Sequence, residues 1–371
     1  MKITAAVAEG PRLPFAVREL ELEQPRHGEV LVRLAGTGIC HTDLICRDQW
    51  YPVPLPAVLG HEGAGVVEAV GPGVGHPLPG DRVVLSFNSC GSCRTCLAGR
   101  SAYCDDFTAR NFTGNRPDGS TPLLDRTGTP VHGTFFGQSS FATHAVAAAR
   151  SVVKVDTTLP LELLGPLACG FQTGAGSVLN SLRCTPGSSL AVFGAGAVGC
   201  GAVMAGAVAG CTTIAVVGRN RARLARAKSV GATHTIDLTA TDPVTALRDL
   251  TGGAGVDYSI EATGSAQILR RAVDCLAQEG ICGLLGAAAL GTEVSLDMAA
   301  LLFGRQVRGI VEGDSTPALF IPRLLDLHRA GRFPFDRLIS LYRLGQINQA
   351  VDDMRHGHAV KPVLTFLGGP A

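Results

Sequence analysis

The 371-residue chain has no excess of charge of either sign. Its 32 Lys and Arg residues nearly balance its 31 Asp and Glu residues, and the two signs are interspersed along the sequence. Proteins that hold nucleic acid or an anionic membrane surface by charge carry a basic patch or stripe. The even balance therefore argues against both kinds of partner.

Other absences narrow the class. The first fifteen residues contain no continuous apolar segment of the kind that forms the core of a signal peptide, so no signal peptide is expected. There is no internal repeat or low-complexity linker, and 46% hydrophobic with 17% charged residues is an ordinary globular composition. The twelve cysteines would suit a disulfide scaffold only in a much shorter secreted chain. We expect a cytoplasmic protein with reduced thiols.

No charged residue occurs between Cys184 and Gly218, a stretch long enough in principle to cross a bilayer. It is rich in glycine, however, and divides into an apolar run (189–196), a small-residue segment (197–210) and a second apolar run (212–218). This pattern predicts a buried strand, a helix and another buried strand, as in parallel sheets. We therefore expect no membrane segment.

The length predicts about two domains. Short alternating runs at 29–39 and 63–71, with many turn residues, predict a β-rich domain up to about 150. From about 165 to 310 the pattern of strand, helix, strand repeats, which predicts a doubly wound parallel sheet. The chain from about 313 returns to mixed helix and strand, and 113–133 is expected to be an exposed loop.

Four cysteines lie close together in CGSCRTCLAGRSAYC, separated by two, two and seven residues. Four thiolates so near in sequence can close a tetrahedron around zinc and leave no open position. Iron–sulfur proteins use similar cysteine runs, and disulfide pairing is a weaker alternative in a reducing compartment. The spacing favours a structural zinc site made by Cys90, Cys93, Cys96 and Cys104.

Three further candidate ligands are dispersed: Cys40 in GICHTDL, His61 in LGHEGAG and Cys169 in GPLACGFQTGAG. Taken singly, each cysteine is more simply a small buried hydrophobe and the histidine a structural one. Together, two thiolates and an imidazole are the three-ligand shell that keeps a fourth zinc position for substrate. Such a zinc ion polarises an alcohol or carbonyl oxygen. Their spacing alone does not bring them together.

The run GAGAVG follows a predicted strand and opens a predicted helix, the context that a dinucleotide-binding loop requires. Its glycines, Gly194, Gly196 and Gly199, would allow a tight turn and a close approach of pyrophosphate to the helix N-terminus. The acidic residue expected about 20 positions later, for the ribose 2′-hydroxyl, is missing. Gly218, Arg219 and Arg221 stand there instead. Arginines suit a 2′-phosphate, so NADP(H) is favoured over NAD(H) unless these arginines only face solvent.

Over nearly its whole length the chain resembles the zinc-dependent medium-chain alcohol dehydrogenases, and most of all the aryl-alcohol (benzyl alcohol) dehydrogenases. The resemblance is carried by CHTDLICRDQWYPVPLPAVLGHEG, RNFTG, FFGQSSFATHA, ELLGPLACGFQTGAG and IPRLLDLHRAGRFPFDRLISLY. It implies an α/β protein with a GroES-like catalytic domain (1–168 with 313–371) carrying both zinc sites, and a Rossmann doubly wound parallel-sheet domain (169–312). It also implies a homodimer or homotetramer.

The resemblance assigns roles at the matching positions. Cys40, His61 and Cys169 would hold the catalytic zinc, with Glu62 as an occasional ligand, and Asp43 would orient the imidazole. Thr42 would bind the substrate oxygen and begin a proton relay. The positions expected to contact the cofactor are His41, Lys361, Thr173 and Val198, and those expected in the substrate pocket, unless they only pack in a loop, are Trp50 and Tyr51.

Two positions depart from the pattern. Ile45 stands where many relatives have a histidine that passes the proton to solvent, so the relay would end on ribose and water or on His41. Gly218 stands where the acidic residue typical of NAD-binding members is expected, which puts NAD preference in doubt.

The activity expected is reversible hydride transfer between a primary aromatic or allylic alcohol and a nicotinamide cofactor, with two zinc ions per chain. A second hypothesis keeps the fold and NADPH but makes the protein a biosynthetic reductase of a conjugated C=C or C=N bond. A third makes it a non-enzymatic zinc- or redox-sensing protein with a nucleotide site. The three-ligand set argues against the third, because open zinc shells usually serve chemistry.

Overall fold

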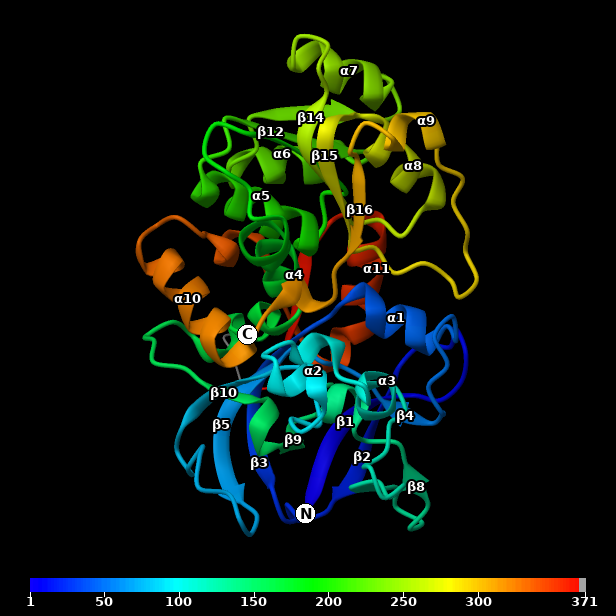
Figure 1. Cartoon of the computed structure of the whole chain (residues 1–371). Helices are drawn as coiled ribbons and strands as arrows, with labels where there is room; N and C mark the ends of the chain where they lie inside the picture. Colours follow the sequence, from blue (N-terminus) through cyan, green and yellow to red (C-terminus); the bar gives the residue numbers. More distant parts are fainter. Residues whose placement is uncertain (367–371) are drawn as a thin grey trace. The chain divides into compact units, whose positions relative to one another are not determined.

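The computed structural model describes residues 1–366 and divides the chain into two units (Figure 1). Unit 1 comprises Met1–Cys169, Thr316–Arg323 and Ile339–Ala371, and unit 2 comprises Gly170–Ser315 and Leu324–Leu338. The predicted catalytic domain began its second segment at 313, and its last five residues, 367–371, lie outside the described part of the chain. The segment 324–338 groups with unit 2, where Phe335 packs against Phe171 with 5.8 Å between ring centroids.

Unit 1 contains two sheets, and the alternating runs in its sequence predicted a β-rich domain. The first has the strand order β4-β1-β2-β7-β8, and the second has the order β10-β6-β5-β3-β18-β17, with β9 also pairing β3. Their bounds are Lys2–Ala8 (β1), Ala16–Leu22 (β2), Glu29–Gly38 (β3), Ala57–Val58 (β4), Gly63–Val70 (β5), Arg82–Leu85 (β6), Leu123–Leu124 (β7), Pro130–Val131 (β8), His144–Ala148 (β9), Val152–Lys154 (β10), Ile339–Arg343 (β17) and Lys361–Thr365 (β18).

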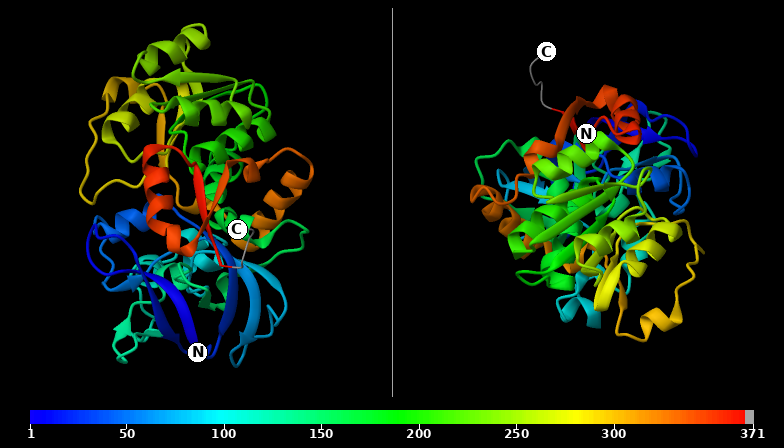
Figure 2. Two further views of the ribbon diagram at one scale, coloured as in Figure 1. Left: turned by 180° about the vertical axis from the view of Figure 1, so that it is seen from behind. Right: turned by 90° about the horizontal axis from the view of Figure 1, so that it is seen from above.

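Strand β3 organises the second sheet because it pairs antiparallel with β5, β9 and β18. Val30, Val32 and Leu34 point from β3 into one apolar cluster, two residues apart as one face of a strand requires. The pairing with β18 joins the two ends of the sequence in one sheet. Helix α11 packs beside β18, as the view from behind shows (Figure 2).

Short helices fill the connections of unit 1. They are α1 (His41–Arg47), α2 (Arg94–Leu97), α3 (Phe107–Asn111) and α11 (Ile347–His356). Helix α11 ends where Gly357 takes a left-handed conformation with φ 84°, which glycine adopts without steric cost. Helix α10 (Pro317–Arg329) connects segments assigned to the two units.

The prediction that residues 113–133 form an exposed loop is wrong in part. The segment contains strands β7 and β8, which form a hairpin, and β7 adds to the first sheet by pairing with β2. Two-residue strands show no alternation that a sequence pattern can reveal. The turn between them is fixed locally, because Asp125 Oδ1 accepts hydrogen bonds from the Thr127 and Thr129 amides and Gly128 has φ 84°.

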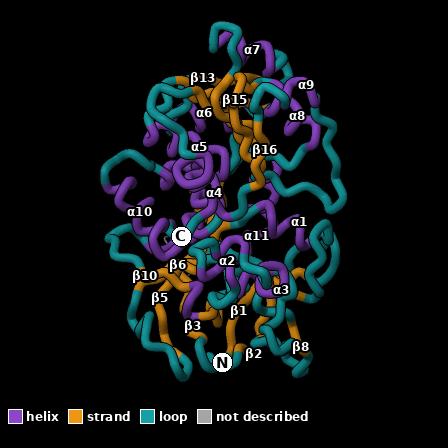
Figure 3. Tube along the Cα trace, viewed as in Figure 1, coloured by secondary structure: helices purple, strands orange, loops and turns teal. Residues whose placement is uncertain are grey.

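Unit 2 contains one six-stranded, fully parallel sheet with the strand order β13-β12-β11-β14-β15-β16. This is the order 3-2-1-4-5-6 of the dinucleotide-binding doubly wound fold, and it confirms the fold class expected from the sequence. The strands are Ser189–Phe193 (β11), Thr213–Gly218 (β12), His234–Asp237 (β13), Val256–Glu261 (β14), Leu276–Leu284 (β15) and Gln306–Gly309 (β16). Helices flank these strands (Figure 3).

Strand β11 is buried on both faces, which explains its continuous apolar sequence. Ala191 and Phe193 lie in a cluster with residues of α7 and α8. On the opposite face, a Cβ on Gly206 of α5 would lie 2.9 Å from Leu190, so α5 needs small residues to approach the sheet. The helices of unit 2 are Gly170–Gly176 (α4), Ala197–Ala209 (α5), Arg221–Ser229 (α6), Pro243–Leu250 (α7), Ala266–Asp274 (α8) and Met298–Leu301 (α9).

The uncharged stretch from Cys184 to Gly218 forms β11, α5 and β12, as its pattern predicted. Among residues 1–366, no helix has both the length and the apolar character needed to cross a membrane.

Candidate functional site

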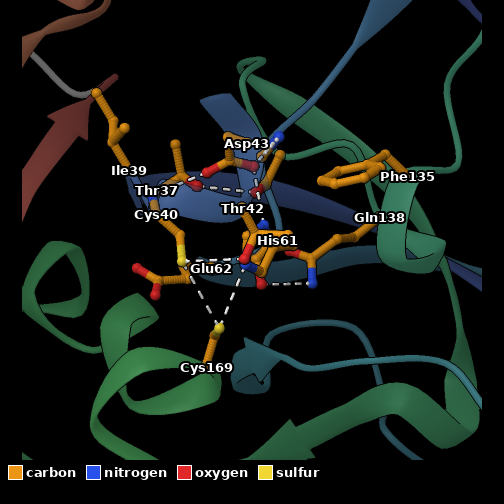
Figure 4. Close-up of polar contacts among 12 residues, drawn as sticks. Thr37, Ile39, Cys40, Thr42, Asp43, His61, Glu62, Phe135, Gln138 and Cys169 are labelled. Atoms are coloured by element: carbon orange, nitrogen blue, oxygen red, sulfur yellow. Dashed lines mark hydrogen bonds and ion pairs between the residues drawn. The ribbon is translucent and has the colours of Figure 1, made fainter. Parts of the chain in front are cut away.

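Cys40, His61 and Cys169 converge in unit 1 although 108 and 129 residues separate Cys169 from the other two. Cys40 is the N-cap of α1, His61 precedes β5, and Cys169 ends the long first segment of the unit. The two Sγ atoms lie 4.0 Å apart, and Cys169 Sγ lies 3.3 Å from His61 Nε2 (Figure 4). Around tetrahedral zinc, such donor atoms lie about 3.5–3.8 Å apart. The three side chains therefore fit a zinc ion.

Asp43 fixes the orientation of this ligand set. It is fully buried, and its Oδ1 lies 2.8 Å from His61 Nδ1 while Oδ2 accepts a hydrogen bond from the Cys40 amide at 2.8 Å. The Nδ1–H bond to the carboxylate leaves Nε2 as the metal-binding nitrogen. Phe136 stacks on the imidazole with 4.5 Å between centroids. Gln138 holds the backbone, since its Nε2 donates to the His61 carbonyl at 3.0 Å.

We expect Asp43→Asn to lower zinc affinity at this site about 10- to 100-fold. An amide whose oxygen faces His61 must place its NH₂ group against the Cys40 amide, a donor facing a donor. Zinc retention during titration with a chelator measures the effect. Asp48→Asn, at the end of the same helix, is the matched control. Equal retention by the two variants would contradict this role for Asp43.

The thiol of Cys40 is prepared for metal binding. A hydrogen bond with Cys169, helped by His61, holds the pKa of Cys40 well below its usual value, against the opposing effect of burial. Zinc binds the thiolate form. Cys46 lies on the same helix and shows the contrast, because burial raises its pKa above the usual range. The local environment thus separates a ligand from a core cysteine six positions away.

Glu62 has a carboxylate oxygen within 4.8 Å of the other three donor atoms. Both of its oxygens accept hydrogen bonds from Lys361 Nζ at 2.9 Å, and the same Nζ donates to the Ile39 carbonyl at 3.1 Å. Burial alone would lower the pKa of Lys361, but Glu62 outweighs it and raises that pKa above its usual range. Lys361 therefore uses all three of its donors inside unit 1. Its expected contact with cofactor pyrophosphate stays a prediction.

The four clustered cysteines have the geometry of a closed zinc site. Their Sγ atoms all lie within 4.8 Å of one another. Backbone amides point at the sulfurs: the amides of Ser92 and Cys93 approach Cys90 Sγ at 3.4 and 3.2 Å and lower the pKa of Cys90 to about 6. Four thiolate donors leave no position for substrate, so this site is structural.

We expect Cys93→Ser to remove one zinc ion per chain and to lower the thermal midpoint by at least about 5 °C. From Cys90 to Cys104 only Ala102 and Cys104 are buried, so metal rather than an apolar core holds the segment. Metal analysis and thermal unfolding provide the measurement. Ser92→Ala, in the same segment, is the matched control, since its side chain is exposed. An unchanged midpoint after loss of the metal would contradict a structural role.

In unit 2, the GAGAVG run follows β11 at the point where the strand order reverses between β11 and β14. Gly194 has φ 113°, which a side chain would strain. A Cβ on Gly199 would lie 1.8 Å from the Gly194 carbonyl, whereas Gly196 has open space within 4 Å. These are the tight turn, the close helix packing and the approach for pyrophosphate that a dinucleotide loop needs. The residues present fit a nicotinamide dinucleotide.

The remaining predicted cofactor positions lie on several elements. Gly218 ends β12 opposite Asp237 of β13, Arg219 is exposed, and Arg221 begins α6. Thr173 is on α4, whose Gly174 packs so tightly on α5 that a Cβ would lie 1.9 Å from the Val198 carbonyl. In unit 1, the exposed His41 begins α1.

The predicted pocket residues differ in environment. Trp50 is 49% exposed. Tyr51 packs edge-on against Phe112, with 6.0 Å between centroids, and Phe112 in turn contacts Phe136, the ring stacked on His61. Phe112 and Phe136 were not singled out from the sequence, although they lie in the segments RNFTG and FFGQSS.

Two zinc sites in unit 1 and a dinucleotide fold in unit 2 define a zinc-dependent oxidoreductase. Family comparisons agree: the "Alcohol dehydrogenase GroES-like domain" matches residues 26–157 and the "Zinc-binding dehydrogenase" family matches residues 197–327. Geraniol dehydrogenase of Castellaniella defragrans is 49% identical over 98% of this chain and 97% of its own length. The chain belongs to the zinc-dependent medium-chain alcohol dehydrogenase family and is an oxidoreductase acting on CH–OH donors.

Solved structures give the same assignment. An alcohol dehydrogenase zinc-binding domain protein from Burkholderia ambifaria has a TM-score of 0.97 at 53% identity, covering 99% of this chain and 100% of that one. Benzyl alcohol dehydrogenase from Acinetobacter calcoaceticus has a TM-score of 0.95 at 46% identity, covering 99% of both chains. The fold class, the two zinc sites and the family expected from the sequence are confirmed.

Proposed function

We propose that the protein interconverts a primary aromatic or allylic alcohol and its aldehyde, using NADP(H). The observation that carries this proposal is the convergence of Cys40, His61 and Cys169 on one position, with Glu62 paired to Lys361. Relatives named for geraniol, an allylic alcohol, and for benzyl alcohol support the substrate class.

A zinc ion held by these three residues supplies a Lewis acid that lowers the pKa of an alcohol oxygen and polarises a carbonyl. The protein holds the ligands in place through Asp43 and supplies a first acceptor for the alcohol proton. We assign that role to Thr42, whose Oγ1 lies 3.7 Å from Cys40 Sγ in the first turn of α1. Ile45 is buried and apolar and cannot carry a proton, so with the cofactor bound the proton would pass from Thr42 to the cofactor ribose and water or to His41.

Aromatic rings near the ligand set support a flat, unsaturated substrate. A chain of ring contacts leads from Tyr51 to Phe112, from Phe112 to Phe136, and from Phe136 to His61. Edge-to-face ring contacts of this kind favour an aryl or allylic group over a saturated chain. We place Tyr51 in the substrate pocket and Trp50 near its entrance.

Tyr51→Ala is then expected to raise KM for benzyl alcohol about tenfold and to change KM for ethanol less; equal effects would contradict the placement.

The preference for NADP(H) is proposed from charge. Gly218 provides no carboxylate at the end of β12, and the exposed arginines Arg219 and Arg221 follow it. A guanidinium binds phosphate by paired hydrogen bonds, and a glycine leaves room for the phosphate.

Steady-state kinetics test the proposal. Benzyl alcohol, geraniol, cinnamyl alcohol and ethanol are compared with NADP⁺ and NAD⁺, and cinnamaldehyde reduction is followed by product analysis. We expect the highest kcat/KM for the first three alcohols with NADP⁺, and cinnamyl alcohol as the reduction product. Saturated aldehyde as product would favour reduction of a conjugated bond, and nucleotide binding without any turnover would favour a sensor.

We also propose a homo-oligomer assembled through unit 2. Among the described residues β16 is the last strand of its sheet and pairs with β15, and Met298, Leu302 and Phe303, which precede it in the sequence, are exposed. An edge strand and exposed apolar groups together favour contact with a second copy. Light scattering should give a dimer or tetramer for the wild type and a smaller species for Leu302→Glu, with Leu13→Glu as control. A monomeric wild type would contradict the proposal.

For location we propose the cytoplasm. None of the twelve cysteines, all of which lie in the described part of the chain, forms a disulfide. Six of them belong to the two zinc groups, where a reducing compartment protects them from pairing.

A further inference from the structure

Strand β12 ends without the acidic residue that NAD-binding folds carry there, but the neighbouring strand β13 ends with one, Asp237. Strands β12 and β13 are parallel, and their last residues are paired, so that Gly218 lies opposite Asp237. Adjacent strands lie about 4.8 Å apart. The carboxylate therefore lies one strand away from the place where dinucleotide-binding folds hold the adenosine ribose.

Asp237 is fixed there by its own turn. Its Oδ1 accepts hydrogen bonds from the Thr239 hydroxyl at 2.6 Å and from the Thr239 amide at 3.0 Å. These bonds, together with Arg221, lower the pKa of Asp237 to about 2. Asp237 is therefore a carboxylate at neutral pH.

The other carboxylate oxygen of Asp237 binds Arg221, whose Nε donates to Oδ2 at 3.0 Å. Arg221 is the first residue of α6, and its side chain is 85% exposed. An exposed ion pair of this kind is weak and exchanges partners readily. The guanidinium that would receive a 2′-phosphate is thus already shared with a carboxylate.

We propose that Asp237 is a specificity-determining residue that sets the preference between NADP(H) and NAD(H) by competing with the 2′-phosphate for Arg221. The phosphate must draw Arg221 away from Asp237 and must tolerate a carboxylate within one Debye length. NAD(H) meets neither opposing effect, because it has a hydroxyl at that position. The proposal rests on the proposed dinucleotide function, but it holds whichever cofactor the wild-type enzyme prefers.

The test is Asp237→Asn, which keeps an oxygen for Thr239 and removes the charge. We expect the ratio of kcat/KM for NADP⁺ to that for NAD⁺ to rise about three- to tenfold, because KM and Kd for NADP⁺ fall. This increase should become smaller as the salt concentration is raised from about 50 to about 500 mM. Asp242→Asn makes the same charge change at the N-cap of α7, where asparagine also caps, and should leave the ratio unaltered.

Arg221 variants complete the design. Arg221→Ala should lower the ratio, and in that background Asp237→Asn should have less effect than in the wild type, because the shared partner is gone. A ratio unchanged in Asp237→Asn, or raised equally by Asp242→Asn, overturns the proposal.

Titration calorimetry of NADP⁺ and NAD⁺ separates this outcome from failure of the proposed function. If no alcohol is oxidised but Asp237→Asn tightens NADP⁺ binding alone, the proposed reaction fails and the role of Asp237 stands. If alcohols are oxidised and Asp237→Asn does not change relative binding, the reaction stands and this role fails.

Discussion

Replacing Cys40 by serine should lower kcat/KM for the alcohol by about 10³-fold or more. The zinc site supplies several kcal/mol of charge stabilisation in the transition state, and about 4 kcal/mol corresponds to three powers of ten in rate. Serine cannot take the place of the thiolate. The contacts with Cys169 and His61 lower the pKa of the Cys40 thiol and so favour an ionised sulfur. The measurement is steady-state oxidation of benzyl alcohol together with zinc content per chain.

The matched control is Cys46→Ala. Cys46 lies on the same helix, is fully buried and belongs to neither zinc group. We expect Cys46→Ala to keep two zinc ions per chain, with kcat within a fewfold of the wild type, whereas Cys40→Ser keeps only one. Unchanged turnover in Cys40→Ser would remove the basis for zinc-dependent alcohol oxidation. Loss of turnover with both zinc ions retained would show that Cys40 is needed for turnover but not for holding the zinc ion.

The parts of the structure that the sequence predicted well are those determined by neighbours in the chain. The apolar strand, small-residue helix and glycine loop around Gly194 have a local pattern, and the structure follows it closely from β11 to β12. The four-cysteine cluster is also local, since Cys90 to Cys104 span a single segment. In both cases the spacing alone determines which groups can meet.

The dispersed site could be predicted only through the family resemblance. Nothing in the spacing of Cys40, His61 and Cys169 brings them together; the sheet pairing of unit 1 does, with β3 leading into Cys40 and β5 starting just after His61. Asp237 was missed for a related reason. It follows β12 in sequence by almost 20 residues, and only the parallel register places it opposite Gly218.

Lys361 is the clearest case in which a pairing has no local signature. It lies 299 residues from Glu62, and the resemblance suggested a contact with cofactor phosphate. The structure places its side chain, 2% exposed, against a fully buried carboxylate, and the contact with cofactor pyrophosphate stays a prediction. A buried pair of this kind forms because β18 lies beside β3, which no sequence period reports.

Lys361→Met should therefore lower the free energy of unfolding by about 3–5 kcal/mol. Removing one partner of a buried ion pair leaves the other charge without compensation, and this cost exceeds the net value of the intact pair. Thermal and denaturant unfolding measure the loss, and KM for the cofactor is measured in parallel. Lys154→Met, a surface pair with Asp81 whose lysine is half exposed, is the control and should change stability by less than about 1 kcal/mol.

The double variant Glu62→Gln/Lys361→Met should regain a large part of the lost stability, because it removes the stranded carboxylate as well as the lysine. A second reading of Lys361 predicts the opposite result. If its main role were to contact cofactor pyrophosphate, the single variant would raise KM for the cofactor with little change in unfolding, and the double variant would recover nothing. The comparison thus decides whether Lys361 serves the cofactor or holds Glu62 beside the catalytic zinc ligands.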